Sequence, residues 1–431
     1  MSVVRYPGGN FVSGYRWRDG VGPLADRPIR ADLAWGAVDP NTFGTNEFMR
    51  FCRTLDLAPY LVVNCGDGDL REARDWVEYC NGVADTALTR LRAAHGHPES
   101  HRVRYWGVGN EVDGAWQIGA KSAAEYARTY REFAKVMRWT DPGIKLIASA
   151  TSDWDGDIVE RAQALVEGAR ELIDLISIHW YVGDQSSDSA EYLATSEVIE
   201  ARLGAFEGLM RGLTLGRHPR PAIPLAVDEW NVWYRTTGAN GGTPPHLLEE
   251  VYDLQDALVV AMHLNAFIRH ASTVRMANLA QLVNVIAPIM AGPDGLVLQT
   301  IFHPFELFSR TTGTMALDAW WEGDTFTGGP FSGVRYLDVS ASLDPDRRRL
   351  SVHIVNRHPT DALDTLIQLD GGQFGGSAEV STVTGANLHD TNTLATPDAV
   401  TTTSQRLEIA AGNRYRLSVP PRSVTGLVFA L

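Results

Sequence analysis

The first three quarters of this chain alternate short apolar runs with segments in which apolar residues recur at helical spacing. That alternation is the pattern of βα units, whose strands are buried in a parallel sheet. A closed barrel of such units needs eight strands, whereas the sequence provides seven. We therefore expect a (β/α)₈-type TIM barrel that lacks its first βα unit, the missing strand lying ahead of residue 1. The predicted strands are 3–5, 60–63, 103–106, 145–148, 175–178, 225–227 and 274–277.

Local signals predict the helices between these strands and a second domain after them. A helix is predicted over 123–139, because Ser122 and Glu125 form a capping box at its start. From about residue 333 the pattern changes to short strands separated by turn residues, which predicts an antiparallel β-sandwich. The expected domains are a barrel at 1–315 and a sandwich at 316–431. The sandwich strands are predicted at 334–342, 349–356, 363–369, 378–384, 406–410, 415–419 and 423–430.

Composition and charge narrow the classes of partner. The chain of 431 residues carries a formal net charge of −14, which argues against nucleic acid because such a partner needs a basic face. No apolar run approaches the ~18 residues of a membrane span, so no membrane partner is expected. The three cysteines, Cys52, Cys65 and Cys80, offer neither a disulfide framework nor metal-ligand spacing. We expect a protein of a reducing compartment, the cytoplasm.

Two glutamates follow predicted strands, at the barrel end where the reactive groups of this fold stand. Gly109-Asn110-Glu111 follows the strand at 103–106, and Asp228-Glu229 follows the strand at 225–227. Glycoside hydrolysis needs two carboxyl groups that face one gap, one to protonate the leaving oxygen and one to attack the anomeric carbon. A lone Glu after a strand is more often a solvated charge, but this pair lies three βα units apart, across the barrel mouth. Glu111 and Glu229 are therefore the candidate catalytic pair.

Neighbouring polar and aromatic residues are candidates for sugar binding. The amide of Asn110 suits the sugar 2-hydroxyl, although Asn is also common in turns. Tyr181 could orient Glu229 through its hydroxyl or pack at the barrel rim, and His179 fits a core histidine as well as a site residue. Trp233 could stack on a sugar ring, with rim packing as an equal alternative. No metal or cofactor is expected, because the histidines have no ligand spacing and neither an HExxH motif nor a phosphate loop is present.

At these residues the sequence resembles the α-L-arabinofuranosidases of glycoside hydrolase family 51. The stretches that carry the resemblance are 5–15, 32–35, 109–119, 228–234 and 280–289. The resemblance implies a retaining exo-enzyme that removes terminal α-L-arabinofuranosyl groups from arabinan, arabinoxylan or their oligosaccharides. It implies Glu111 as the acid/base and Glu229 as the nucleophile, in a protein that is often intracellular and commonly a homo-hexamer. The positions that it implies for the arabinose subsite are Arg5, Asn10, Asn110, Tyr181 and Gln281.

One departure from the family pattern affects the expected activity. Members carry a further N-terminal segment that supplies the first βα unit and a sugar-binding Glu, and the count of seven strands agrees with its absence. We therefore expect a truncated gene model, with a gap between the strands at 3–5 and 274–277 and weakened substrate affinity. Two alternatives stay open. One is another retaining glycosidase of the same clan, such as a xylosidase or an endo-glucanase, and the other is a non-catalytic carbohydrate-binding remnant.

Overall fold

The computed structural model describes residues 2–215 and 221–431, in a chain that divides into two compact units. None of the helices within those two ranges is both long and apolar enough to cross a membrane. The domain boundary expected at residue 316 stays a prediction. The first unit comprises Met1–Trp180, Glu207–Trp230 and Thr273–Asn278, and the second comprises Tyr181–Phe206, Asn231–Ser272 and Leu279–Leu431.

A seven-stranded sheet has the order β1-β4-β5-β6-β7-β8-β11. The strand pairs from β1 to β7 are parallel, and successive strands of the sheet follow one another along the chain with helices between them. This is the βα alternation that the apolar runs predicted, and the seven predicted strands are confirmed. The strands are β1 (Val3–Tyr6), β4 (Ala58–Val63), β5 (Tyr105–Val108), β6 (Lys145–Thr151), β7 (Leu175–Val182), β8 (Leu225–Val232) and β11 (Val274–Leu279).

The end strands of this sheet are β1 and β11, as the count of seven predicted. The side-chain amide of Asn278, in β11, donates to the carbonyl of Val3, in β1, over 3.4 Å. A side chain thus connects the two end strands of the sheet. In a fully paired barrel, the backbone groups at both edges would be hydrogen-bonded to a neighbouring strand. The sheet is a nearly closed TIM-like barrel with β1 and β11 as its end strands.

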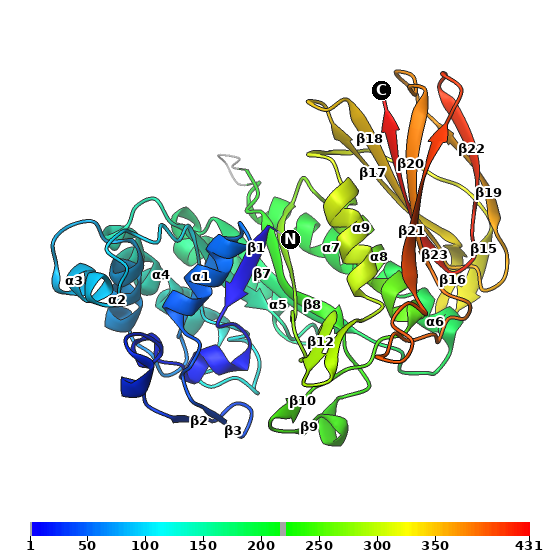
Figure 1. Cartoon of the computed structure of the whole chain (residues 1–431). Coiled ribbons are helices and arrows are strands. Elements are labelled where there is room, and N and C mark those ends of the chain that lie inside the picture. The colour runs from blue at the N-terminus through cyan, green and yellow to red at the C-terminus, as the bar shows by residue number, and fades with distance from the viewer. Residues whose placement is uncertain (1, 216–220) are drawn as a thin grey trace. The chain divides into compact units, whose positions relative to one another are not determined.

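Helix α4 shows how local signals define the helices of the first unit. It spans Ala123–Thr140, and Ser122 and Glu125 form the predicted capping box at its start. Its buried side chains, Tyr126 and Tyr130 among them, recur at helical spacing, so that one face packs against α2 and α5. Figure 1 shows these helices in blue to teal. The other helices of the unit are α1 (Thr45–Thr54), α2 (Leu70–Asn81), α3 (Ala87–Ala94) and α5 (Ile158–Ala169).

The strand predicted at 103–106 begins two residues later in the structure, at Tyr105. The reason is Asn81, whose side chain accepts from the N–H of Val103 and donates to the Val103 carbonyl, both over 2.8 Å. A side chain therefore satisfies the backbone groups that a neighbouring strand would otherwise bind. Val103 is apolar whether or not it belongs to the strand. The apolar pattern therefore includes it and places the start of the strand too early.

The second unit contains an antiparallel β-sandwich, as predicted, with α8 (Leu254–Arg269) and α9 (Phe302–Thr311) packed against it. Its larger sheet has the order β14-β17-β18-β23-β20-β21, and β19 pairs with β22 in a smaller sheet (Figure 1). Leu350 and Phe429 of the larger sheet belong to a buried core against which Leu363 and Leu417 of the smaller sheet pack. The strands are β14 (Met315–Leu317), β17 (Leu337–Asp344), β18 (Arg349–Asn356), β19 (Leu363–Gln368), β20 (Ser377–Thr384), β21 (Thr401–Glu408), β22 (Arg414–Val419) and β23 (Ser423–Ala430).

Two sandwich strands differ from their predicted bounds. The run at 334–342 is divided at Tyr336, whose N–H donates to the Asp324 carbonyl over 2.9 Å. The strand expected at 406–410 begins earlier, at Thr401, with a polar and exposed sequence that an edge strand such as β21 tolerates. The remaining helices and strands are α6 (Ser189–Leu193), α7 (Ser196–Leu213), β2 (Arg30–Asp32), β3 (Ala37–Asp39), β9 (Gly242–Thr243), β10 (His246–Leu247), β12 (Ile289–Gly292), β13 (Gly295–Leu298), β15 (Thr325–Gly328) and β16 (Phe331–Arg335).

Candidate active site

Side chains from β1, β7, β8 and the segment after β5 meet in the first unit. Arg5 lies in β1, His179 in β7 and Glu229 in β8, while Asn110 and Glu111 follow β5 directly. The carboxyl ends of parallel strands meet at one end of a barrel, which brings together residues more than 200 positions apart. The structure thus brings four of the predicted site residues, Arg5, Asn110, Glu111 and Glu229, to one place.

The backbone that presents Glu111 takes a conformation that non-glycine residues rarely adopt. Glu111 has a φ of 43°, and Gly109, two residues earlier, has a φ of 78°. A Cβ atom at Gly109 would lie 2.8 Å from Cβ of Cys65 and 2.9 Å from Cγ1 of Val112, so only glycine fits there. A strained backbone of this kind persists only where the surrounding structure holds it, and it is typical of functional sites.

Both carboxylate oxygens of Glu111 have partners. The indole N–H of Trp116 donates to Oε2 over 2.6 Å, and Nδ1 of His179 lies 3.1 Å from Oε1. The residue as a whole is 8% exposed, and Glu229 is 9% exposed. Both carboxylates are therefore largely withdrawn from water.

Arg5 connects Glu229 to Asn110. Its Nη1 atom donates to Oε2 of Glu229 over 3.0 Å, and its Nη2 atom donates to Oδ1 of Asn110 over 2.5 Å. Nε lies 3.7 Å from Oδ2 of Asp228. Burial by itself lowers the pKa of Arg5, but the neighbouring acidic groups, Asp228 first among them, raise that pKa above the ordinary arginine value. Arg5 is thus a permanent cation that favours the ionised form of Glu229.

His179 is a second cation among the carboxylates. Its Nε2 atom lies 3.1 Å from Oδ1 of Asp228, and its Nδ1 atom lies 3.6 Å from Oε2 of Glu229 in addition to the contact with Glu111. Burial by itself lowers the pKa of His179, but these carboxylates outweigh it and raise the pKa to about 10. The ring therefore carries a proton on both nitrogens at neutral pH.

Asp228 is the fixed counter-charge of both cations. Its Oδ1 accepts from the hydroxyl of Ser177 over 2.5 Å, and its Oδ2 accepts from the hydroxyl of Tyr60 over 2.7 Å. Burial raises the pKa of Asp228, but Arg5 and His179 outweigh it and lower the pKa to about 2. Asp228 thus stays ionised and holds the two cations in position.

The gap between the two catalytic candidates is short. A carboxylate oxygen of Glu111, one of Glu229 and a ring nitrogen of His179 all lie within 4.8 Å of one another. Carboxyl groups about 5–5.5 Å apart are typical of retaining glycosidases, whereas inverting enzymes keep roughly 6.5–9.5 Å for a water molecule. The three groups also have a geometry that could hold a metal ion. A protonated His179 has no lone pair with which to bind such an ion. Its positive charge instead forms ion pairs with the two carboxylates.

Asn10 is also in the first unit, at the start of a 3₁₀-helix spanning Asn10–Gly14. Its carbonyl lies 3.5 Å from Nε2 of Gln117, which also contacts the Ser13 hydroxyl. This contact positions the backbone, and the expected role of the Asn10 side chain in the arabinose subsite stays a prediction.

Tyr181, Trp233 and Gln281 belong to the second unit. Tyr181 lies near the end of β7 and Trp233 directly follows β8, and their rings are in edge-to-face contact with centroids 5.2 Å apart. The backbone N–H of Gln281 donates to the Ile286 carbonyl over 3.3 Å. The roles that sequence analysis expected for these three side chains stay predictions.

The sequence predicts no role for Asp228, Trp116, Ser177 or Tyr60, and it leaves the role of His179 open between core and site. One signal was available for two of them, because Ser177 and His179 are two residues apart in a strand and therefore share a face. Trp116 carried no comparable signal. It lies five residues after Glu111 in an irregular segment, and its contact depends on the path of that segment.

Sequence comparison shows which family this chain belongs to. Residues 1–196 match the α-L-arabinofuranosidase 1 domain, and residues 228–423 match the α-L-arabinofuranosidase C-terminal domain. An intracellular exo-α-(1→5)-L-arabinofuranosidase of Halalkalibacterium halodurans is 38% identical over 390 residues, which are 87% of this chain and 76% of that relative. The chain belongs to the α-L-arabinofuranosidases of glycoside hydrolase family 51. An intracellular exo-α-(1→5)-L-arabinofuranosidase of Bacillus subtilis is 36% identical. The matched residues are 86% of this chain and 75% of the Bacillus protein.

Solved structures of family 51 members have the same fold. An α-L-arabinofuranosidase of Thermotoga maritima, crystallised with arabinose, has a TM-score of 0.90 at 36% identity. The matched region is 100% of this chain and 88% of the Thermotoga chain. The family 51 enzyme of Bifidobacterium longum has a TM-score of 0.92 at 31% identity. The matched region is 100% of this chain and 87% of the Bifidobacterium chain. A xyloglucanase of glycoside hydrolase family 44 from Paenibacillus polymyxa, at 13% identity and a TM-score of 0.66, shares the fold alone.

Proposed function

We propose that this chain is a retaining, exo-acting α-L-arabinofuranosidase that hydrolyses terminal non-reducing arabinofuranosyl groups of arabinan, arabinoxylan or their oligosaccharides. Family membership supports the substrate class, and the names of the relatives favour α-(1→5)-linked oligosaccharides as the first substrates to test. Those names also support an intracellular location. Assembly into a homo-oligomer stays a prediction. The observation that carries the proposed mechanism is the short gap between the buried carboxylates of Glu111 and Glu229.

The proposed reaction has two displacements. In the first, the Glu229 carboxylate attacks the anomeric carbon, the glycosidic bond breaks, and the leaving oxygen takes a proton from Glu111. Arg5 supports this step, because its hydrogen bond to Oε2 favours the ionised nucleophile. In the second, Glu111 takes a proton from water, the water oxygen bonds to the anomeric carbon, and Glu229 leaves as a carboxylate. Two inversions at one carbon retain the configuration.

Asn110 supplies independent support for sugar binding at this site. Its Oδ1 accepts from Arg5, so that Nδ2 is left as the donor end of the amide. Nδ2 is buried and has no hydrogen-bond partner among the residues that the structure describes. Buried donors of this kind are rare, because a missing hydrogen bond costs about 1–3 kcal/mol. A sugar hydroxyl is the acceptor that we propose for it, in accordance with the role expected for Asn110.

The remaining substrate contacts rest on the sequence: motif position in the family suggests Asn10, Tyr181 and Gln281, and the capacity of its ring to stack on a sugar suggests Trp233. Asn10, Tyr181, Trp233 and Gln281 are proposed to complete the arabinose subsite with Arg5 and Asn110. Trp233 is four residues after Glu229 in the chain, immediately past the end of β8.

Hydrolysis of a panel of 4-nitrophenyl glycosides tests the proposal. We expect turnover of the α-L-arabinofuranoside and at most trace turnover of the β-D-xyloside, β-D-glucoside and cellobioside. Arabino-oligosaccharides should release arabinose as the first product, as an exo-enzyme requires. Preference for the xyloside or the cellobioside would contradict the substrate assignment. A folded chain that binds arabinose without turning over any glycoside would indicate the non-catalytic alternative.

A further inference from the structure

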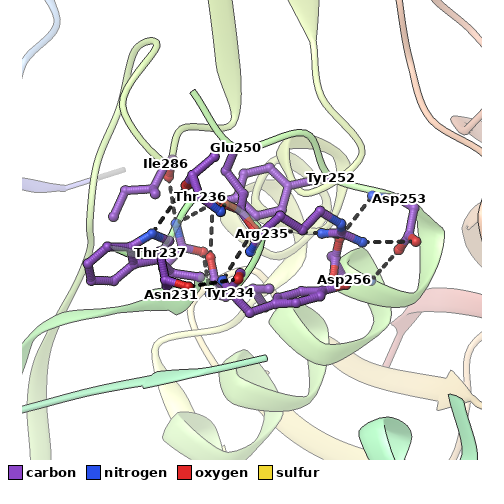
Figure 2. A network of polar contacts seen from close by, with 12 residues as sticks. Asn231, Tyr234, Arg235, Thr236, Thr237, Glu250, Tyr252, Asp253, Asp256 and Ile286 are labelled. Atoms are coloured by element: carbon purple, nitrogen blue, oxygen red, sulfur yellow. Dashed lines mark hydrogen bonds and ion pairs between the residues drawn. The ribbon is translucent and has the colours of Figure 1, made fainter. Parts of the chain in front are cut away.

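A fully buried carboxylate, that of Glu250, binds the loop that follows β8. The backbone N–H groups of Tyr234, Arg235 and Thr236 donate to it over 3.3, 2.9 and 2.8 Å. The hydroxyl of Thr236 also donates to its Oε2 atom, over 2.5 Å. Figure 2 shows these contacts converging on Glu250. The Thr236 hydroxyl is the donor of this hydrogen bond, so its hydrogen points at Glu250.

The orientation of that hydroxyl determines what Trp233 can bind. With its hydrogen directed at Glu250, Oγ1 of Thr236 presents a lone pair, and the indole N–H of Trp233 donates to it over 3.2 Å. The edge-to-face contact with Tyr181 restricts the same ring from another side. The indole N–H is therefore already used, and what the half-buried Trp233 offers to a ligand is its apolar ring surface.

Further contacts hold Glu250 and the loop in place. Arg235 donates to Oδ2 of Asp256 over 2.8 Å and to Oδ2 of Asp253 over 3.1 Å, at the N-terminus of α8 (Figure 2). Its Nη1 atom also lies 3.8 Å from Oε1 of Glu250. The side-chain amide of Gln299 donates to the Glu250 carbonyl over 2.9 Å. The hydrogen-bond chain from Glu250 to Trp233 thus starts from a residue fixed through both its side chain and its backbone.

We propose that Glu250 is a positioning residue that acts through Thr236 to hold the indole of Trp233 as a stacking surface for the substrate sugar. This inference rests on the proposed function, in which Trp233 contacts the arabinofuranosyl substrate. Glu250 and Thr236 touch neither substrate nor the reacting atoms. Their effect belongs to substrate binding, and it passes through a single hydrogen bond, from the indole N–H to Oγ1 of Thr236.

The test is Thr236→Val, which keeps the shape of the side chain and removes the hydroxyl. We expect KM for 4-nitrophenyl α-L-arabinofuranoside and the inhibition constant of L-arabinose both to rise about fivefold, the equivalent of one lost hydrogen bond, with kcat within about twofold. Glu250→Gln should shift both constants in the same direction, because an amide has one acceptor oxygen and cannot accept from the three backbone N–H groups and the Thr236 hydroxyl as the two carboxylate oxygens do. Thr236→Ser should restore both constants. Thr237→Val is the matched control, because it removes a neighbouring hydroxyl that donates to the Tyr234 carbonyl, over 3.1 Å, and not to Glu250.

A double-mutant cycle separates positioning through the indole from a general loosening of the loop. Trp233→Phe keeps a ring and lacks the N–H, so adding Thr236→Val to it should change KM by less than about twofold. A fivefold rise in that background, or a fall in kcat at unchanged KM, would overturn the inference. If Thr236→Val unfolds, as thermal denaturation would show, Glu250→Gln and Trp233→Phe form the same cycle. A wild-type chain without turnover of any arabinofuranoside would contradict the proposed function, and this inference with it. An active wild type with unchanged KM in Thr236→Val would overturn this inference alone.

Discussion

Nδ1 of His179 lies 3.1 Å from Oε1 of Glu111, the candidate acid/base. The other nitrogen of the same ring contacts Asp228, whose pKa Arg5 and His179 lower to about 2 against the effect of burial, so that Asp228 is ionised. His179 is therefore an imidazolium that donates to Glu111. This relationship connects the charge of the acid/base to a residue that sequence analysis could not distinguish from a core histidine.

The two glutamates should differ in which step each controls. Glu229→Ala should reduce turnover of every arabinofuranoside by about a thousandfold or more, because the covalent step is lost. Glu111→Ala should spare the first step on 2,4-dinitrophenyl α-L-arabinofuranoside, whose leaving group needs little protonation, and slow the second. A burst of dinitrophenol and an arabinosyl adduct seen by mass spectrometry would show this. Exposed Glu99→Ala is the control. Equal loss in both variants without an adduct would mean that the roles are wrongly assigned.

The short gap between the carboxylates predicts the stereochemistry of the product. Oxygens of Glu111 and Glu229 within 4.8 Å leave no room for a water molecule to attack directly, so the configuration should be retained. Proton NMR of the first minutes of hydrolysis should show the α-anomer of arabinofuranose before it equilibrates. The β-anomer as first product would show that the enzyme inverts.

Removal of the His179 charge should move the pH dependence of activity. The imidazolium lies 3.1 Å from Oε1 of Glu111 and 3.6 Å from Oε2 of Glu229, so His179→Asn removes a positive charge that both carboxylates contact. Ionisation of the nucleophile sets the acidic limb of kcat/KM and protonation of the acid sets the basic limb. Both limbs should therefore move to higher pH in His179→Asn, by about one unit. His101→Asn, in which a different buried histidine is replaced, should leave both limbs in place. Unmoved limbs in His179→Asn would show that the histidine does not control the charge of either glutamate.

Arg5 should contribute to stability as well as to catalysis. Arg5→Met leaves the buried carboxylates of Asp228 and Glu229 without this cation, and breaking a buried ion pair costs about 3–5 kcal/mol. The free energy of unfolding from a urea titration should fall by that amount, and kcat/KM should fall as well. Arg5→Lys should recover part of the stability but little activity, because an ammonium group cannot bridge Glu229 and Asn110 as the planar guanidinium does.

The matched control for Arg5 is Arg90→Met, which breaks an exposed pair with Asp85 of 3.3 Å. Such surface pairs contribute about 0–1 kcal/mol. An equal loss of unfolding free energy in the two variants would show that the charge of Arg5 is solvated and not part of a buried network.

The strands of the barrel were predictable because they are buried on both sides and therefore appear as continuous apolar runs. Their bounds were less predictable, as β5 shows. Asn81 takes the backbone hydrogen bonds of Val103, and no local pattern near Val103 indicates that a distant side chain will do so.

The sequence by itself determined which apolar runs form the strands of the barrel and which polar residues come directly after those runs, and thereby identified Glu111 and Glu229 as the catalytic candidates. It also determined the order of the βα units and the change to a sandwich, since both follow from local periodicity. Only the tertiary structure decided that His179 lies between the two glutamates and that Arg5 joins Glu229 to Asn110. The physical reason is that hydrogen bonds depend on ångström-scale side-chain placement. That placement is set by strand register and by packing between residues far apart in the chain.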